Sequence, residues 1–252
     1  MKYSGLYFIP TSTNSPADSS NTLNTLISAL ESTFHTLSRT TSWSLTYRLF
    51  RDTPPRVDPS SDTTSYAHTY QHFLTQSSLS QNRAYIYIAP PASKGPGTVA
   101  AIPAQQSEAQ ALLLRNQLAA LWSPRHTLSV QNGATYTGGL FTVQIGEVRA
   151  LREGQGGGVS SPGVVVCIST IAGGDEDAAE VNGAANGAAA EEEVEFEFAQ
   201  VTIRGFWGKL REGRDLGRSE VREVLMTPKE GGNAEEKEAA VRMWCEVLRL
   251  RG

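Results

Sequence analysis

The stretch VEFEFAQVTIRGFWGKL, residues 194–210, constrains the fold more than any other part of this chain. At its start, apolar residues alternate with period two at Val194, Phe196 and Phe198. The spacing then becomes helical, with Ile203, Phe206, Trp207 and Leu210. A period of two is typical of a half-buried strand, and a spacing of three to four is typical of an amphipathic helix. We therefore predict a strand that leads directly into a helix, with Trp207 on the buried face of that helix.

Similar short runs recur along the chain and predict a β-rich fold. Strands are expected at residues 2–9, 43–50, 66–74, 83–89, 98–102, 126–130, 140–148 and 164–171. Helices are expected at residues 23–37, 111–122, 203–210 and 234–250. Turn residues, Asn132-Gly133 and Gly138-Gly139, lie between or beside the strands at 126–130 and 140–148. The expected fold is α+β: an antiparallel β-barrel or a strongly curled sheet of about eight strands, with three to four flanking helices, in one domain spanning 1–252.

Length and cysteine content limit the class of protein. A chain of 252 residues can bury a core without disulfides or metals. Its two cysteines, Cys167 and Cys245, provide no disulfide framework, and Cys167 lies in a continuous apolar run, where a buried free thiol is expected. No apolar run approaches the roughly 20 residues that span a bilayer, and the first residues do not resemble a leader peptide. We expect a soluble intracellular protein with no membrane association.

Charge is distributed unevenly along the second half of the chain. Residues 173–193 are acidic and of low complexity, which predicts a disordered insertion within the domain. Residues 204–222 carry six basic and three acidic side chains. This basic segment could bind nucleic acid, but no aromatic residues interleave with its charges after Trp207. A solvated helix face is the favoured interpretation, and no sequence-specific nucleic-acid binding is expected.

Glu195 and Glu197 are the strongest chemical lead in the sequence. On a strand, both carboxylates would point to one face, while Phe196 and Phe198 would point to the other. Paired carboxylates inside a barrel hold a divalent metal in tunnel-shaped phosphohydrolases. Such a site needs a second acidic pair on a facing strand, and none of the other predicted strands contains a Glu-x-Glu motif. The favoured interpretation is that the phenylalanines face the core and the glutamates face water.

Other candidate motifs predict no chemistry. His68 and His72 are four residues apart, as in some zinc sites, but the surrounding aromatic residues alternate as in a strand, so two exposed histidines are expected. The glycine-rich loop at 154–158 precedes a strand instead of a helix, unlike a phosphate-binding loop. No Gly-x-Ser-x-Gly elbow is present. We expect a non-enzymatic protein with no catalytic, metal-binding or cofactor-binding residues.

The order of these pieces resembles a known family. The strings that carry the resemblance are Gly5–Pro10, Trp43–Phe50, Tyr85–Ile88, Leu112–Trp122, Tyr136–Val148, Gly163–Val166, Phe196–Phe198 and Phe206-Trp207. Together they resemble subunit 20 of the Mediator complex of RNA polymerase II transcription, in its fungal form. The resemblance covers nearly the whole chain except the acidic stretch at 173–193, which the family pattern does not require.

The resemblance implies a role in transcription. Members of the family are non-catalytic coactivator subunits of the Mediator head module, in which a β-barrel with flanking helices pairs with subunit 18. A C-terminal helix of subunit 8 tethers that heterodimer to the rest of the head module, which couples regulators to RNA polymerase II. The resemblance therefore implies a nuclear protein, with subunit 18 and subunit 8 as partners and RNA polymerase II as an indirect one.

Overall fold

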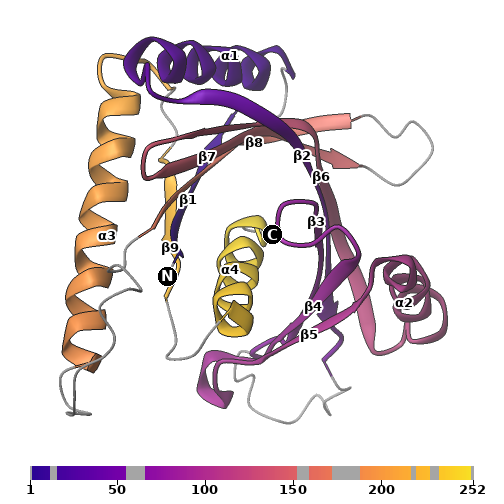
Figure 1. Ribbon diagram of the computed structural model, residues 1–252. Coiled ribbons are helices and arrows are strands. Elements are labelled where there is room, and N and C mark those ends of the chain that lie inside the picture. Colours follow the sequence, from indigo (N-terminus) through magenta and orange to yellow (C-terminus); the bar gives the residue numbers. More distant parts are fainter. Residues whose placement is uncertain are drawn as a thin grey trace.

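The computed structural model describes residues 2–11, 16–54, 66–151, 159–171, 188–216, 220–227 and 233–250 (Figure 1). The strands are β1 (Lys2–Pro10), β2 (Ser38–Asp52), β3 (Tyr70–Gln76), β4 (Arg83–Ala89), β5 (Thr98–Pro103), β6 (Trp122–Gly138), β7 (Phe141–Leu151), β8 (Val159–Ile171) and β9 (Arg222–Leu225). The helices are α1 (Pro16–Thr33), α2 (Ser107–Leu112), α3 (Ala188–Arg211) and α4 (Asn233–Leu248). A strongly curled α+β fold was expected and is confirmed.

The nine strands form one antiparallel sheet in the order β5-β4-β3-β2-β6-β7-β8-β1-β9. Among the described strands, β5 and β9 each pair on one side only, so the sheet is open and the alternative of a barrel was wrong. The strands predicted at 66–74 and 83–89 are confirmed as the antiparallel neighbours β3 and β4, although β3 begins only at Tyr70. The sheet curls around α4 without closing on itself (Figure 1).

A bulge in β6 replaces one of the expected turns. Asn132 has a positive φ of 56°, and the register with β2 shifts nearby, yet the strand continues to Gly138. A Cβ on Gly133 would lie 2.5 Å from the indole of Trp43, so only glycine lets this side chain lie flat on the bulge. The other expected turn is confirmed, since Gly139 has a φ of +57° between β6 and β7.

Helix α4 fills the concave side of the sheet. Its buried residues pack against side chains of the strands that line the curl, and the rings of Trp43 and Trp244 lie 5.6 Å apart. His126 on β6 donates a hydrogen bond from Nε2 to the carbonyl oxygen of Leu248, 3.0 Å away, at the end of the helix. The helix predicted at 234–250 is therefore the element around which the sheet curls.

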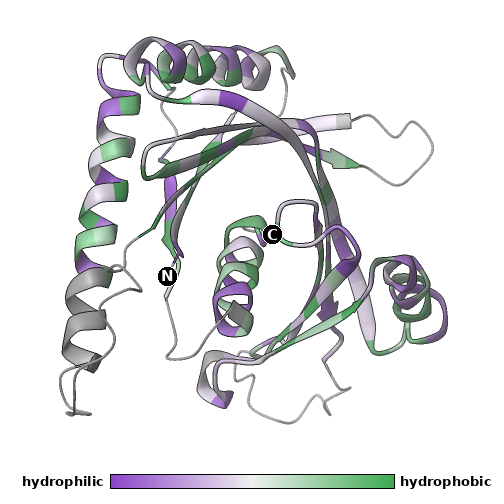
Figure 2. Ribbon diagram, in the orientation of Figure 1, coloured by the Kyte–Doolittle hydropathy of each residue, from purple (hydrophilic) through white to green (hydrophobic). Residues whose placement is uncertain are grey.

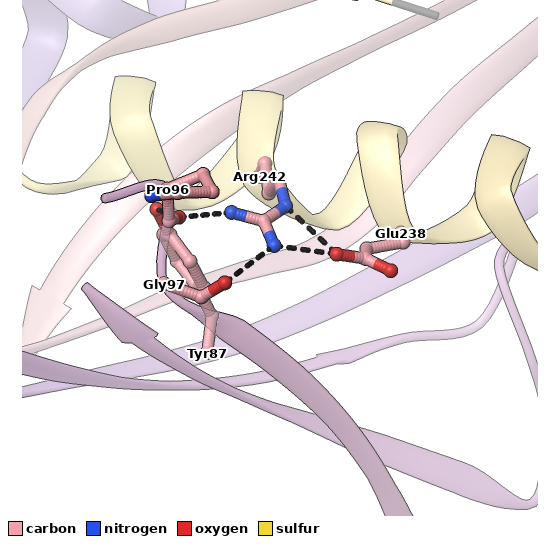
Figure 3. A network of polar contacts seen from close by, with 5 residues as sticks. All are labelled: Tyr87, Pro96, Gly97, Glu238 and Arg242. Atoms are coloured by element: carbon pink, nitrogen blue, oxygen red, sulfur yellow. Dashed lines mark hydrogen bonds and ion pairs between the residues drawn. The ribbon is translucent and has the colours of Figure 1, made fainter. Parts of the chain in front are cut away.

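A polar contact also fixes α4 to the loop between β4 and β5 (Figure 3). Arg242 donates hydrogen bonds to the carbonyl oxygens of Pro96 and Gly97, the latter at 2.9 Å, and pairs with Glu238 one turn earlier on the helix. Its guanidinium lies 5.0 Å from the centroid of the Tyr87 ring, a cation–π distance. We call these five residues the Arg242 clasp. It joins the C-terminal helix to the β4–β5 edge of the sheet.

Helices α1 and α3 cover the convex side. The rings of Tyr7 and Trp207 stack at 4.4 Å, and those of Phe34 and Phe206 stack at 3.9 Å, which ties α3 to β1 and to the end of α1. Figure 2 shows hydrophobic and hydrophilic residues alternating along both helices, as expected when one face packs on a sheet. β1 is buried on both faces, because α4 covers one and α3 the other.

The strand predicted at residues 194–198 was wrong, because α3 is one helix from Ala188 to Arg211. Phe196 packs against Tyr3 at a ring distance of 5.6 Å, whereas the side chain of Phe198 is 67% exposed. A run of only three alternating residues, preceded by alanines and glutamates that favour helix, carried too little information to define a strand. The helix also takes in the end of the insertion predicted at 173–193, and residues 173–187 of that insertion lie outside the described residues.

Two further elements differ from expectation. The helix predicted at 111–122 is shorter: α2 ends at Leu112, a π-helical turn covers Leu113–Gln117, and Trp122 already begins β6. β9, the four-residue edge strand Arg222–Leu225, was not predicted. Its few residues offer no recognisable period, and pairing with β1 alone makes them a strand.

Candidate interaction surfaces

The two glutamates singled out from the sequence do not form a paired carboxylate site. Both residues lie on α3, which is a helix, so the strand that would have placed two carboxylates on one face is not formed there. The side chain of Glu197 is exposed. Among the described residues, no group of three or more histidine, cysteine, aspartate or glutamate side chains is placed to hold a metal. The geometry required for a carboxylate-bound metal is therefore missing at Glu195 and Glu197.

The basic segment at 204–222 uses several of its charges within the fold. Arg204 forms an ion pair with Glu223 of β9 at 3.1 Å. Arg214 donates to the carbonyl oxygen of Leu210 at 2.9 Å and to Thr33 Oγ1 at 3.2 Å. Lys209 and Arg211 lie in the last turn of α3, where cations interact favourably with the helix dipole. These contacts favour the interpretation of a solvated helix end over that of a phosphate-binding stripe.

The histidines at 68 and 72 are in different environments. His72 was expected to be exposed, but its side chain is buried on β3, where its Nδ1 lies 2.8 Å from the Tyr47 hydroxyl. Burial lowers the pKa of His72 to about 3, and its Nε2 has no hydrogen-bond partner within the described part of the chain. His68 instead lies 2.8 Å from a carboxylate oxygen of Asp52. The two imidazoles therefore serve separate contacts and do not form a zinc site.

Asp52 illustrates how the sheet end is held together by charge. Burial opposes ionisation of this carboxyl group, but hydrogen bonds from His68 and Tyr66 outweigh it and hold the pKa of Asp52 below its ordinary value.

Burial also opposes ionisation of the two cysteine thiols. Cys167 and Cys245 are both free and buried, as expected for Cys167, and desolvation raises the pKa of Cys167 to about 11. Neither thiol is placed to react as a nucleophile.

What the described surface offers instead is apolar side chains in solvent. On the outer face of α3, Phe198 and Val201 are 67% and 68% exposed. Leu140, in the β6–β7 turn, and Ile171, at the end of β8, are exposed at one end of the sheet. A third group surrounds α2, where Leu112 and Leu151 line a pocket of about 500 Å³. Phe198 and Val201 are three residues apart on α3 and therefore adjacent on its surface, and contiguous exposed apolar residues of this kind are typical of a surface that a partner covers.

Comparison with known families decides between these interpretations. The family described as "TATA-binding related factor (TRF) of subunit 20 of Mediator complex" matches residues 1–240. The chain belongs to the Mediator subunit 20 family. This finding confirms the resemblance drawn from short apolar strings such as Gly5–Pro10, and makes the chain a Mediator subunit with a role in transcription.

The other comparisons add little to the family assignment. No curated protein matches the chain. A conserved hypothetical protein of Pyrococcus furiosus is 11% identical, with 83% of this chain and 90% of that chain covered and a TM-score of 0.39. The PH1012 protein of Pyrococcus horikoshii OT3 is 9% identical over the same shares, with a TM-score of 0.40. The PH1819 protein of that organism is 11% identical with both chains fully covered, and its TM-score is 0.38.

Several features of this Mediator subunit were not recognisable in the sequence. The pocket beside α2 is lined by residues from four separate stretches of the chain, 48–50, 108–127, 150–151 and 160. These stretches belong to β2, to α2 with the π-helical turn and β6, to β7 and to β8. Its charged residues, Arg48, Glu108, Arg115 and Arg125, show no common spacing that could have brought them together. The Arg242 clasp depends on a loop carbonyl that carries no sequence signal. Only the exposed apolar residues could have been recognised from their sequence neighbours. Leu140 follows two glycines in a turn, and Phe198 lies away from the apolar face of its helix.

Proposed function

We propose that this Mediator subunit is a non-catalytic, nuclear component of the head module that forms a heterodimer with subunit 18. In this proposal, a C-terminal helix of subunit 8 tethers the heterodimer, and the assembly helps to couple regulators to RNA polymerase II. The observation that carries the proposal is the family match over residues 1–240. The exposed apolar residues on α3 and at the sheet end support it, because a permanent partner would remove them from water.

The proposal includes no enzymatic activity. The only catalytic alternative, a metal-dependent phosphohydrolase, required Glu195 and Glu197 side by side on a strand, and both lie on α3. No helix within the described ranges is long and apolar enough to cross a membrane.

Co-expression with subunit 18 of the same organism tests the pairing. We expect the two chains to elute together in size-exclusion chromatography, with the mass of a one-to-one complex by light scattering. A permanent interface should bury on the order of 2,000 Å² or more. A monodisperse single chain that ignores subunit 18 at micromolar concentration would contradict the proposal.

Surface variants locate the interface and test the absence of catalysis. Phe198→Asp combined with Val201→Asp changes two exposed side chains and should leave the fold intact; loss of the complex in this variant would place subunit 18 on α3. Leu140→Asp combined with Ile171→Asp is the matched variant for the sheet end.

A phosphate-release assay tests the absence of catalysis. The wild type should release no phosphate from a nucleoside triphosphate with Mg²⁺ or Mn²⁺. Hydrolysis that disappears in a Glu195→Gln, Glu197→Gln variant would refute the non-enzymatic assignment.

A further inference from the structure

The pocket beside α2 combines features that the family assignment does not explain. It has a volume of about 500 Å³. α2, which supplies part of its lining, lies on the outer side of the curled sheet, away from α1 and α3 (Figure 1). We call it the α2 groove and define it by Arg48, Glu108, Leu112, Arg115, Arg125 and Leu151. Strands β2, β6 and β7 form its floor and one wall, and α2 with the following π-helical turn forms the other wall.

The groove has an apolar interior that extends into solvent. Phe50 and Ala111 are buried at its base, where they belong to a small core beneath α2. Leu112 from the helix and Leu151 from β7 are 44% and 47% exposed at its mouth. The gradient from buried to half-exposed apolar groups is typical of a binding groove that receives apolar side chains from another molecule.

Cations surround this interior. Arg48, Arg115 and Arg125 line the groove, and Glu108 is the only acidic residue among the lining residues that the structure describes. Arg48 and Glu108 pair at 2.5 Å. The side chains of Arg115 and Arg125 are exposed to solvent. Arg125 also lines a neighbouring pocket of about 940 Å³, whose other charged residues, Arg222, Arg249, Glu220 and Glu223, are of both signs, so the excess of positive charge is confined to the α2 groove. This local excess of positive charge occurs on a chain whose formal net charge is −4.

The backbone of one wall is irregular in a way that serves the groove. The π-helical turn at Leu113–Gln117 buries Leu114 in the core beneath α2 and leaves Arg115 at the groove. π-helical turns cost stability relative to a regular helix and are frequent at functional sites. In this turn, the neighbouring residues Leu114 and Arg115 point in different directions, so Leu114 packs in the core while Arg115 lines the groove.

We propose that the α2 groove binds an acidic amphipathic helix of another protein. Such a helix presents apolar residues at i, i+3, i+4 and i+7 on one face, which match Leu112, Leu151 and the apolar base. Acidic residues flanking that face meet Arg115 and Arg125, so charge complementarity selects an acidic helix over a basic or neutral one. The inference rests on the groove alone and does not require pairing with subunit 18.

A designed peptide tests the groove directly. The probe is a fluorescein-labelled, acetylated and amidated 15-residue helix with leucine at i, i+3, i+4 and i+7 and glutamate or glutamine elsewhere. Fluorescence anisotropy should show saturable binding that weakens as the salt concentration rises, because exposed charges are screened. The same peptide with lysine in place of glutamate should not bind, and neither should a scrambled peptide of identical composition.

Matched charge reversals assign the site. Arg115→Glu combined with Arg125→Glu should weaken peptide binding at least tenfold, whereas Arg39→Glu, an exposed reversal at the far end of β2, should change it less than twofold. NMR spectroscopy of methyl-labelled wild-type protein provides a second measurement that needs no variant. When the peptide is added, the largest changes in chemical shift should come from the methyl groups of Leu112 and Leu151.

Four results would overturn the inference. They are binding that is equal in the double reversal and the wild type, methyl shifts centred elsewhere, absence of binding by the acidic peptide, and preference for a DNA duplex over the peptide. The titration is repeated on the complex with subunit 18. If the complex binds the peptide as tightly as the single chain does, the groove is free for a partner other than subunit 18. If the complex does not bind the peptide at all, subunit 18 itself covers the groove. Failure of the complex to form leaves the peptide titration on the single chain as an independent test.

Discussion

Removal of the Arg242 guanidinium should loosen the helix around which the whole sheet curls. The Arg242→Ala variant deletes two hydrogen bonds to loop carbonyls, the ion pair with Glu238 and the cation–π contact with Tyr87 (Figure 3). The side chain of Arg242 is only 18% exposed, so little of this interaction is screened by water. A lysine at this position keeps the charge but cannot reach both carbonyls with one planar group.

The size of the effect follows from these contacts. Hydrogen bonds to charged groups contribute about 1.5–3 kcal/mol each when buried, but the carbonyl of exposed Pro96 can bind water instead, so about 1 kcal/mol each is appropriate here. The cation–π contact adds about 0.5–1 kcal/mol, and the ion pair a few tenths. The total loss is about 2–3 kcal/mol, and a domain of this size loses about 2–4 °C in Tm per kcal/mol. We therefore expect a decrease of roughly 5–10 °C for Arg242→Ala and about half of that for Arg242→Lys.

Thermal unfolding followed by circular dichroism measures the global effect, and hydrogen exchange measures the local one. Amides of the β4–β5 loop and the middle of α4 should exchange faster in Arg242→Ala, while those of β7 and β8 should not change. Lys237→Ala, an exposed cation on the same helix, is the matched control and should leave Tm within about 1 °C. A Tm for Arg242→Ala within 2 °C of wild type, or an equal loss in Lys237→Ala, would show that the clasp does not hold the helix.

Three other perturbations have defined outcomes. Trp207→Ala should cost about 3–5 kcal/mol by removing the stacked ring beneath α3, whereas Arg211→Ala, exposed on the same helix, should cost less than 0.5 kcal/mol by denaturant unfolding. The pKa of His72 lies near 3 in the folded state, below its unfolded value of about 6.5, so the unfolded chain binds a proton that the folded chain does not. The free energy of unfolding should therefore be unaffected above pH 7 and fall by up to ~1.4 kcal/mol per pH unit below pH 6.5. His72→Asn should flatten that part of the pH profile, and an unchanged slope would contradict the role given to His72. Deletion of residues 175–187 should shift Tm by no more than a few degrees, because this acidic segment has little apolar surface to bury, and a larger loss would show that it is docked.

Periodicity identified the elements that bury one continuous apolar face. The strand at 2–9 and the helix at 234–250 were predicted to within two residues, because their apolar residues keep one spacing over many positions. The helix predicted at 23–37 is present as α1, but it spans Pro16–Thr33, so its start was placed too late and its end too far along the chain. Trp207 was placed on a buried face for the same reason, and its stacking on Tyr7 confirms that placement. Burial is the force that keeps these elements in place, so the pattern that produces it is visible in the sequence.

Elements fixed by distant contacts could not be predicted in this way. Phe198 continues an alternation by chance and lies in water on a helix, whereas β9 is a strand only because β1 offers it a free edge. The open sheet could not be distinguished from a barrel, because closure depends on whether the edge strands meet, and here α4 occupies the space inside the curl. The α2 groove likewise arises where four separate segments come together.

The position of β1 has a consequence for how this chain is made in the cell. β1 leaves the ribosome before the eight other strands described here, yet it lies between β8 and β9, and its Pro10 pairs with Gly163, about 150 residues later. At a synthesis rate of about 5–20 residues per second, β1 waits roughly 8–30 s for its first partner. During that time its apolar side chains, which include Leu6, Tyr7 and Phe8, can be bound by chaperones or join other nascent chains. Substitutions in β1 that barely change the stability of the finished protein can therefore lower its yield, because they act on the chain while it is still being translated.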